Sequence, residues 1–107
     1  MKNRVQLIGN AGNDPIIKSF EGGKKLANLS IATKDSYKND KGERVDQTEW
    51  HTVVAWGKTA EIIEKFVTKG KQVAIDGKLT HRSYEDKNGE KRYITEVVVS
   101  EIMLLGK

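Results

Sequence analysis

Residues 48–56 read Thr-Glu-Trp-His-Thr-Val-Val-Ala-Trp. The run is rich in β-branched and aromatic residues and contains neither glycine nor proline, so it predicts a β-strand. Side chains alternate between the two faces of a strand, which puts Trp50 and Trp56 on the same face, roughly 20 Å apart. A row of aromatic rings suits stacking against unpaired nucleobases. The alternative is two half-buried tryptophans of an ordinary core.

The rest of the chain predicts further strands and one helix. Alternation and turn-bounded apolar runs predict strands at 5–9, 26–33, 72–84 and 91–105, with a further short extended stretch at 16–20. Residues 35–47 are polar and highly charged, and we expect them to form a loop that carries Tyr37. The spacing of apolar residues predicts a helix over 60–67, with Phe66 in the core and Gly70 as its C-terminal cap.

Five strands with one helix between the third and fourth is the order of the OB-fold. The fold class is therefore all-β, a five-stranded Greek-key barrel, and we expect one domain over residues 1–107. The second and third strands of such a barrel, with the loops beside them, form its usual binding face. The tryptophan strand is the third.

Composition excludes several classes of protein. The chain has 107 residues and no cysteine, so disulfides and thiolate metal sites are excluded. We find neither an apolar run of signal-peptide length nor a membrane span, and therefore expect a cytoplasmic protein without a membrane partner. The net charge of +4 favours a polyanionic partner only slightly.

The distribution of the basic residues is more informative than their number. In the expected strand 72–84, Lys78 and Arg82 share a face with Tyr84, and basic groups interleaved with aromatics suit a groove that tracks a nucleic-acid backbone. The other lysines that could pair with phosphates are Lys34, Lys58, Lys69 and Lys71. Any single lysine, however, is more often a solvated surface charge than a phosphate contact.

Motifs for catalysis are nearly absent. The chain contains no phosphate-binding Gly-x-x-x-x-Gly-Lys-Ser/Thr and no His-Glu-x-x-His. Glu49 and His51 share a strand face near Asp46, which leaves a metal-dependent nuclease on the same barrel as an alternative. His51 faces away from the tryptophans, and we interpret it as a packed or interface residue. We expect no metal and no cofactor.

Several segments together resemble one family. They are Leu7-Ile8-Gly9-Asn10 with Asp14-Pro15, Leu29-Ser30-Ile31-Ala32-Thr33, Gln47-Thr48-Glu49-Trp50-His51, Gly57-Lys58 with Ala60-Glu61, and Tyr93-Ile94-Thr95-Glu96-Val97-Val98-Val99. In order and spacing the chain resembles the bacterial single-stranded DNA-binding protein over almost its whole length. The resemblance implies an OB-fold, usually a homotetramer, that coats and protects unpaired DNA in replication, recombination and repair, at the nucleoid.

The resemblance also assigns residues by position. Trp50, Trp56, Tyr37 and Tyr84 match the family's stacking aromatics, and Lys58, Lys69 and Arg82 match its phosphate-contacting residues. His51 matches a residue at a subunit interface. Tyrosine replaces a common tryptophan at two of these positions, 37 and 84, which implies weaker stacking there. Thr52 replaces a frequent arginine, which removes a possible phosphate contact.

The chain ends at Lys107, where the family continues into a flexible tail with an acidic tip that recruits replication and repair proteins. We expect such partners only if a tail follows Lys107. A trimmed chain and a variant without the tail fit equally well. A primosomal OB-fold protein is the alternative within this fold, and its expected lower tryptophan content disfavours it.

Overall fold

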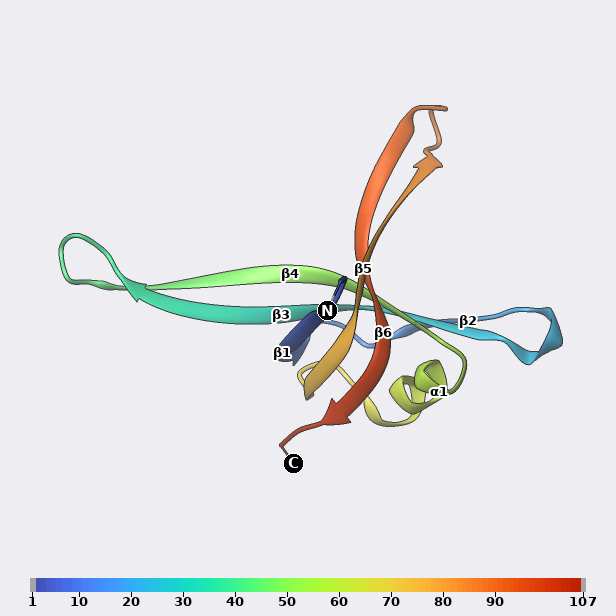
Figure 1. Cartoon of the computed structure of the whole chain (residues 1–107), viewed down its shortest axis with the longest axis horizontal. Helices are drawn as coiled ribbons and strands as arrows, with labels where there is room; N and C mark the ends of the chain where they lie inside the picture. The colour runs from blue at the N-terminus through green and yellow to red at the C-terminus, as the bar shows by residue number, and fades with distance from the viewer. Residues whose placement is uncertain (1, 107) are drawn as a thin grey trace.

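The computed structural model describes residues 2–106, and it consists mainly of strands (Figure 1). The elements are β1 (Val5–Ala11), β2 (Ile16–Ser19), the 3-10 turn η1 (Glu21–Gly23), β3 (Lys25–Lys38), β4 (Arg44–Trp56), α1 (Gly57–Phe66), β5 (Gln72–Glu85) and β6 (Lys91–Leu104). Lys107, the last residue of the sequence, lies outside the described residues. In residues 2–106, no helix has the length and apolar character needed to span a membrane.

The strands close into a barrel. Their order is β1-β5-β6-β4-β3-β2, and an additional antiparallel pairing between β1 and β3 joins Asn10 to Ala32 and Ala11 to Ile31. That pairing closes a ring of five strands, and β2 pairs with β3 beside it. The predicted five-stranded barrel is confirmed, with β4, the tryptophan strand, as its third strand and α1 between its third and fourth strands.

The core follows the alternation of the barrel strands. Along β3 and β4 the odd-numbered residues point inward, so Leu29, Ile31, Val53 and Ala55 are buried. The core residues of the remaining barrel strands are Ala11, Val73, Ile75, Val97 and Val99. The barrel wall is tight at Gly9, where a Cβ atom would collide with the carbonyl oxygen of Ala32, and equally tight at Gly77. Glycine therefore lets β1 reach β3 and close the barrel.

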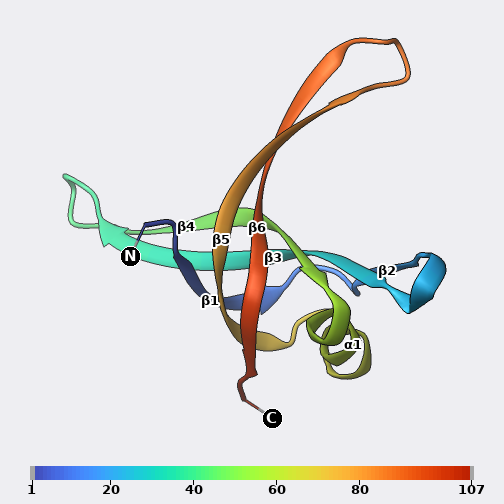
Figure 2. The same ribbon diagram turned by 45° about the vertical axis from the view of Figure 1, so that its right-hand side comes forward.

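Three hairpins project from the barrel in different directions (Figures 1 and 2). The prediction of a loop over 35–47 was wrong, because β3 and β4 stay paired as far as Lys38 and Arg44. The side-chain oxygen of Asn39 accepts hydrogen bonds from two backbone N–H groups of the short turn. Both faces of this hairpin meet solvent, so its residues show no hydrophobic alternation that could have predicted the strands.

Helix α1 covers the barrel with a narrower stripe than predicted. Ala60, Ile63 and Val67 are buried against the core, whereas Phe66 is 56% exposed, so its placement in the core was wrong. The helix has ten residues and rests on the barrel with one face only. Leu79, which alternation along residues 72–84 predicts to point inward, is 38% exposed because β5 leaves the barrel for its hairpin there.

Candidate nucleic-acid interface

The two tryptophans lie on the outer face of the barrel. Trp50 is 62% exposed and Trp56 is 49% exposed, whereas Val53 and Ala55 between them are buried. Their cross-strand neighbours on β3 are Ala32 for Trp50 and Leu26 for Trp56. The alternation predicted from the sequence is confirmed, and the interpretation as core tryptophans is not.

Trp50 lies directly over Gly12. A Cβ atom at Gly12 would collide with the benzene ring of the Trp50 indole. The Gly12 N–H donates to the Ser30 carbonyl over 2.8 Å, which fixes the glycine against β3. Because Gly12 has no side chain, the Trp50 indole can pack directly on its backbone. No pattern in the sequence predicts this contact.

Trp56 has an aromatic neighbour from another hairpin. The Phe20 ring centroid is 5.9 Å from that of Trp56, with the two planes 31° apart. Phe20 follows β2, far from β4 in the sequence, and it is 46% exposed. Sequence reasoning left Phe20 unassigned, because only the pairing of β2, β3 and β4 brings the two rings together.

Strand pairing continues the outer face from β4 to β5. Val54 of β4 lies beside Val98 of β6, and residues that lie side by side in a sheet share a face. Two residues before Val98, Glu96 pairs with Thr80 of β5. The β5 residues of that face are the predicted basic and aromatic row, namely Lys78, Thr80, Arg82 and Tyr84. The tryptophans and this row therefore occupy one continuous surface, which we call the outer aromatic face.

Arg82 is held in place by a buried carboxylate. Its Nε donates to Oε1 of Glu96 over 2.8 Å, and this hydrogen bond raises the pKa of the guanidinium. Glu96 is only 6% exposed, whereas the Arg82 side chain is 53% exposed. The pair fixes the direction of Arg82 and leaves about half of its side chain open to solvent.

Tyr37 lies apart from the other predicted stacking residues. It is on β3 opposite Val45. The register between β3 and β4 has no bulge, so Tyr37 lies on the same face of the sheet as Ile31 and His51 and on the opposite face from Trp50. Tyr37 therefore points from the other face of the β3–β4 hairpin, where it is 52% exposed. Tyr84 is 47% exposed on the outer aromatic face.

The predicted lysines border the outer aromatic face at several places. Lys34 pairs with Thr48 on the face of Trp50, and Lys58 lies exposed in the first turn of α1, two residues after Trp56. Lys69 and Lys71 lie in the segment after α1. The backbone of that segment is hydrogen-bonded to β1, since the Ala11 N–H donates to the Lys71 carbonyl over 2.9 Å. This hydrogen bond lies next to Gly12, on which Trp50 packs.

His51 points to the opposite side of β4. It pairs with the buried Ile31, and its Nε2 lies 3.0 Å from the Thr33 hydroxyl. Half-buried, it lines a small groove with Leu79 and Thr95, between the diverging strands β4 and β6. The structure thus confirms the direction of His51, whereas its place in a subunit interface stays a prediction.

The acidic residues of the nuclease alternative do not converge with His51. Asp46 lies on the other face of β4 from Glu49, by alternation, and accepts a 2.7 Å hydrogen bond from Ser36. Within residues 2–106, no cluster of three or more acidic or histidine side chains could hold a metal ion.

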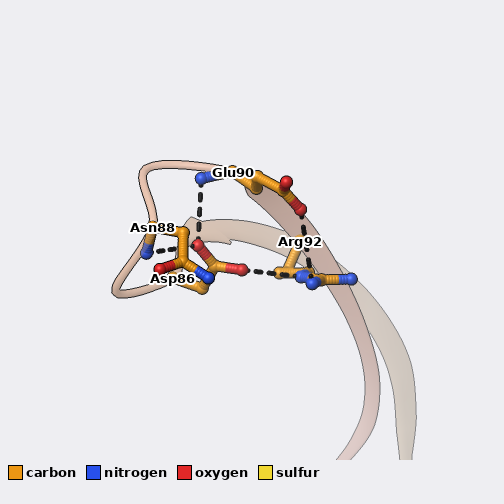
Figure 3. A network of polar contacts seen from close by, with 4 residues as sticks. All are labelled: Asp86, Asn88, Glu90 and Arg92. Carbon is orange, nitrogen blue, oxygen red and sulfur yellow. Dashed lines mark hydrogen bonds and ion pairs between the residues drawn. The ribbon is translucent and has the colours of Figure 1, made fainter.

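The tip of the β5–β6 hairpin is ordered by one carboxylate (Figure 3). Asp86 accepts hydrogen bonds of 2.9 Å from the backbone N–H groups of Asn88 and Glu90, and one of 2.8 Å from Nε of Arg92. The Arg92 guanidinium, followed by the Glu90 N–H, lowers the pKa of Asp86. This network holds the turn just beyond Tyr84 in one conformation.

Comparisons with known proteins match the chain to one family. A family model described as the single-strand binding protein family matches residues 2–105. Single-stranded DNA-binding protein 1 of Chlorobaculum tepidum is 43% identical over 105 residues, which are 97% of this chain and 65% of that protein. Single-stranded DNA-binding protein 1 of Xylella fastidiosa is 44% identical over 106 residues, 98% of this chain and 78% of that protein.

Solved structures resemble the chain over nearly its whole length. The Plasmodium falciparum SSB in complex with ssDNA has a TM-score of 0.90 at 30% identity, with 99% of this chain and 97% of that one covered. A deletion mutant of the single-stranded DNA binding protein from Thermus aquaticus has a TM-score of 0.83 at 28% identity, with 97% of this chain and 50% of that one covered.

Proposed function

Because the chain belongs to the single-strand binding protein family, we propose that it binds single-stranded DNA through the outer aromatic face and has no enzymatic activity of its own. The observation that carries the proposal is the pair of half-exposed indoles, Trp50 and Trp56, on one face with Arg82 and Tyr84. Bases of any sequence present a flat π-face, so stacking on these rings is tolerant of sequence. A binder of this kind coats and protects unpaired DNA during replication, recombination and repair.

The phosphates are contacted by the basic residues around the rings. Lys58 is the best placed of them, because it is exposed and lies two residues after Trp56. Arg82, aligned by Glu96, offers a second fixed cation on the same face. Lys34, Lys69, Lys71 and Lys78 complete the proposed set. Tyr37 can stack a base only if the bound DNA passes around to the other face of the β3–β4 hairpin.

Salt dependence tests the phosphate contacts. For oligo-dT, log K should fall linearly with log salt, with a slope of about −0.7 for each phosphate neutralised. Lys58→Gln should make that slope shallower by about 0.7, measured by fluorescence anisotropy of a labelled oligonucleotide. Lys65→Gln is the matched control, since Lys65 is exposed on the same helix and has no assigned role.

Two results would argue against this binding mode. One is an affinity that does not change with salt. The other is equal affinity for duplex DNA of the same length, because bases stacked in a duplex are not available to the indoles.

We also propose that the protein assembles into a homotetramer with His51 in an interface. An exposed apolar row on the barrel supports self-association, since Ile8, Ala74 and Met103 are neighbours across β1, β5 and β6. Ile8 and Met103 are each 64% exposed. Burial of such side chains is the main favourable term in subunit association.

Light scattering over a range of concentrations tests this assembly. His51→Tyr and Ile8→Glu should each shift the protein toward smaller species at low concentration, because close-packed interfaces tolerate added volume or charge poorly. Higher concentration should restore both the oligomer and DNA binding by mass action. Ile62→Glu, at an exposed apolar site on α1, is the control. If the His51→Tyr variant stays fully assembled at all concentrations, the placement of His51 in the interface is wrong.

The location and the protein partners follow from the same proposal. We propose that the protein works in the cytoplasm, at the nucleoid, where it would meet unpaired DNA. The chain spans 65% of the Chlorobaculum tepidum relative and 78% of the Xylella fastidiosa relative, so the activity and partners of a full-length protein are part of the proposal. Replication and repair proteins are partners where a tail extends beyond Lys107.

A further inference from the structure

We propose that the DNA path continues past Trp56 onto the β2–β3 hairpin, where Phe20 stacks a further base and Lys18 and Lys24 contact its phosphates. The inference rests on the proposed function and extends the site to a hairpin outside the predicted binding residues. Its starting point is the pair of rings of Phe20 and Trp56, 5.9 Å apart, with about half of each side chain exposed.

Strand pairing puts this part of the hairpin on the outer aromatic face. Lys18 pairs with Leu26, and Leu26 pairs with Trp56, so these three residues form a row across β2, β3 and β4. Phe20 is two residues after Lys18 and therefore has the same parity. Its backbone N–H donates to the Lys24 carbonyl over 2.8 Å, which places Lys24 opposite Phe20 at the hairpin end.

The charges of the hairpin support a phosphate track. Lys25 points to the other face, where its Nζ forms a 2.7 Å ion pair with Glu64 of α1. That ion pair ties the hairpin to the helix. Within residues 2–106, neither Lys18 nor Lys24 forms an ion pair, and both are exposed. The hairpin therefore presents two available cations on either side of Phe20, which is the alternation that a stacking groove requires.

The turn leaves the Phe20 ring accessible. Gly22 and Gly23 of η1 have φ values of 84° and 80°, a conformation that favours glycine. A Cβ at either position would meet no atom within 4 Å, so this end of the hairpin is open. Phe20 itself is 46% exposed, so part of its ring is open to a base that leaves Trp56.

Photocross-linking to oligo-dT tests for direct contact. Ultraviolet irradiation of the complex, followed by digestion and mass spectrometry, should give a nucleotide adduct on Phe20 as well as on a tryptophan. The chain has two phenylalanines, and Phe66, although 56% exposed on α1, should stay unmodified. Adducts on Trp50 or Trp56 without any on Phe20 would overturn the extension while leaving the proposed function intact.

Variants separate stacking on DNA from support of Trp56. Phe20→Ala should weaken binding of oligo-dT by about five- to tenfold, whereas Phe66→Ala should leave it unchanged. Phe20→Leu keeps an apolar contact with Trp56 but has no π-face, so it should weaken binding almost as much as alanine. Full affinity in Phe20→Leu would show that Phe20 only supports the indole, and would overturn the proposal.

The length of the oligonucleotide provides the last comparison. A series of oligo-dT lengths across about 4–16 nucleotides covers the range bound by single OB-folds. The loss in Phe20→Ala should be absent for the shortest oligomers that reach both tryptophans and appear once the strand reaches the hairpin. Absence of any loss at every length would refute the extension. If the wild-type protein bound no oligomer at all, the proposed function would fail instead.

Discussion

Alanine at both Trp50 and Trp56 is expected to weaken binding of oligo-dT by about 2–6 kcal/mol, with little dependence on base sequence. Each base–aromatic stack contributes about 1–3 kcal/mol, and sites roughly 20 Å apart should contribute independently. Fluorescence anisotropy of labelled DNA measures the loss, and circular dichroism checks that the double variant is folded.

The fluorescence of the protein offers an internal control. The chain has two tryptophans, so its indole emission comes from this site alone. Poly-dT should quench that emission strongly in the wild type, and each single variant should report quenching of the remaining indole. A folded double variant with unchanged affinity would refute the stacking mechanism.

Gly9→Ala is expected to lower the free energy of unfolding by about 1–3 kcal/mol, the typical effect of overpacking. Its Cβ would collide with the backbone carbonyl of Ala32 and lie 2.9 Å from Cγ2 of Ile31, where β1 meets β3. Backbone in a closed barrel cannot move aside as a side chain can. Urea unfolding followed by circular dichroism measures the change.

Gly12→Ala is the matched comparison, because its Cβ would meet the Trp50 indole instead of backbone. The ring can turn away, so we expect a smaller loss of stability, a change in tryptophan emission and weaker DNA binding. Equal stability of Gly9→Ala and the wild type would contradict the assignment of Gly9 to barrel closure.

The sequence predicts those parts of the site in which buried and exposed residues alternate regularly. Alternation in residues 48–56 is enough to put Trp50 and Trp56 on one outer face, because the strand has one face in a core. The same pattern fails for residues 35–47, since the projecting hairpin has no buried face. The predicted burial of Phe66 fails for a related reason. The spacing of apolar residues shows which residues of the helix could be buried, but not how much of the helix surface the barrel covers.

Other features of the site depend on contacts between distant segments. Phe20 meets Trp56 only through the pairing of three strands. Glutamate is usually a surface residue, yet the pairing of β6 with β4 and β5 buries Glu96 beside Arg82. Such contacts have no local sequence pattern, so reasoning from single segments could not have found them.

The pairing that joins β4 to β6 is short, as is the pairing of β1 with β3. Strands β4 and β6 pair only through Val53 with Val97 and Val54 with Val98, whereas the pairing of β3 with β4 and of β5 with β6 extends along whole hairpins. The orientation of the β5–β6 hairpin relative to the β3–β4 hairpin is therefore set by a contact far shorter than either hairpin, in which the side chains of Val53 and Val97 are buried.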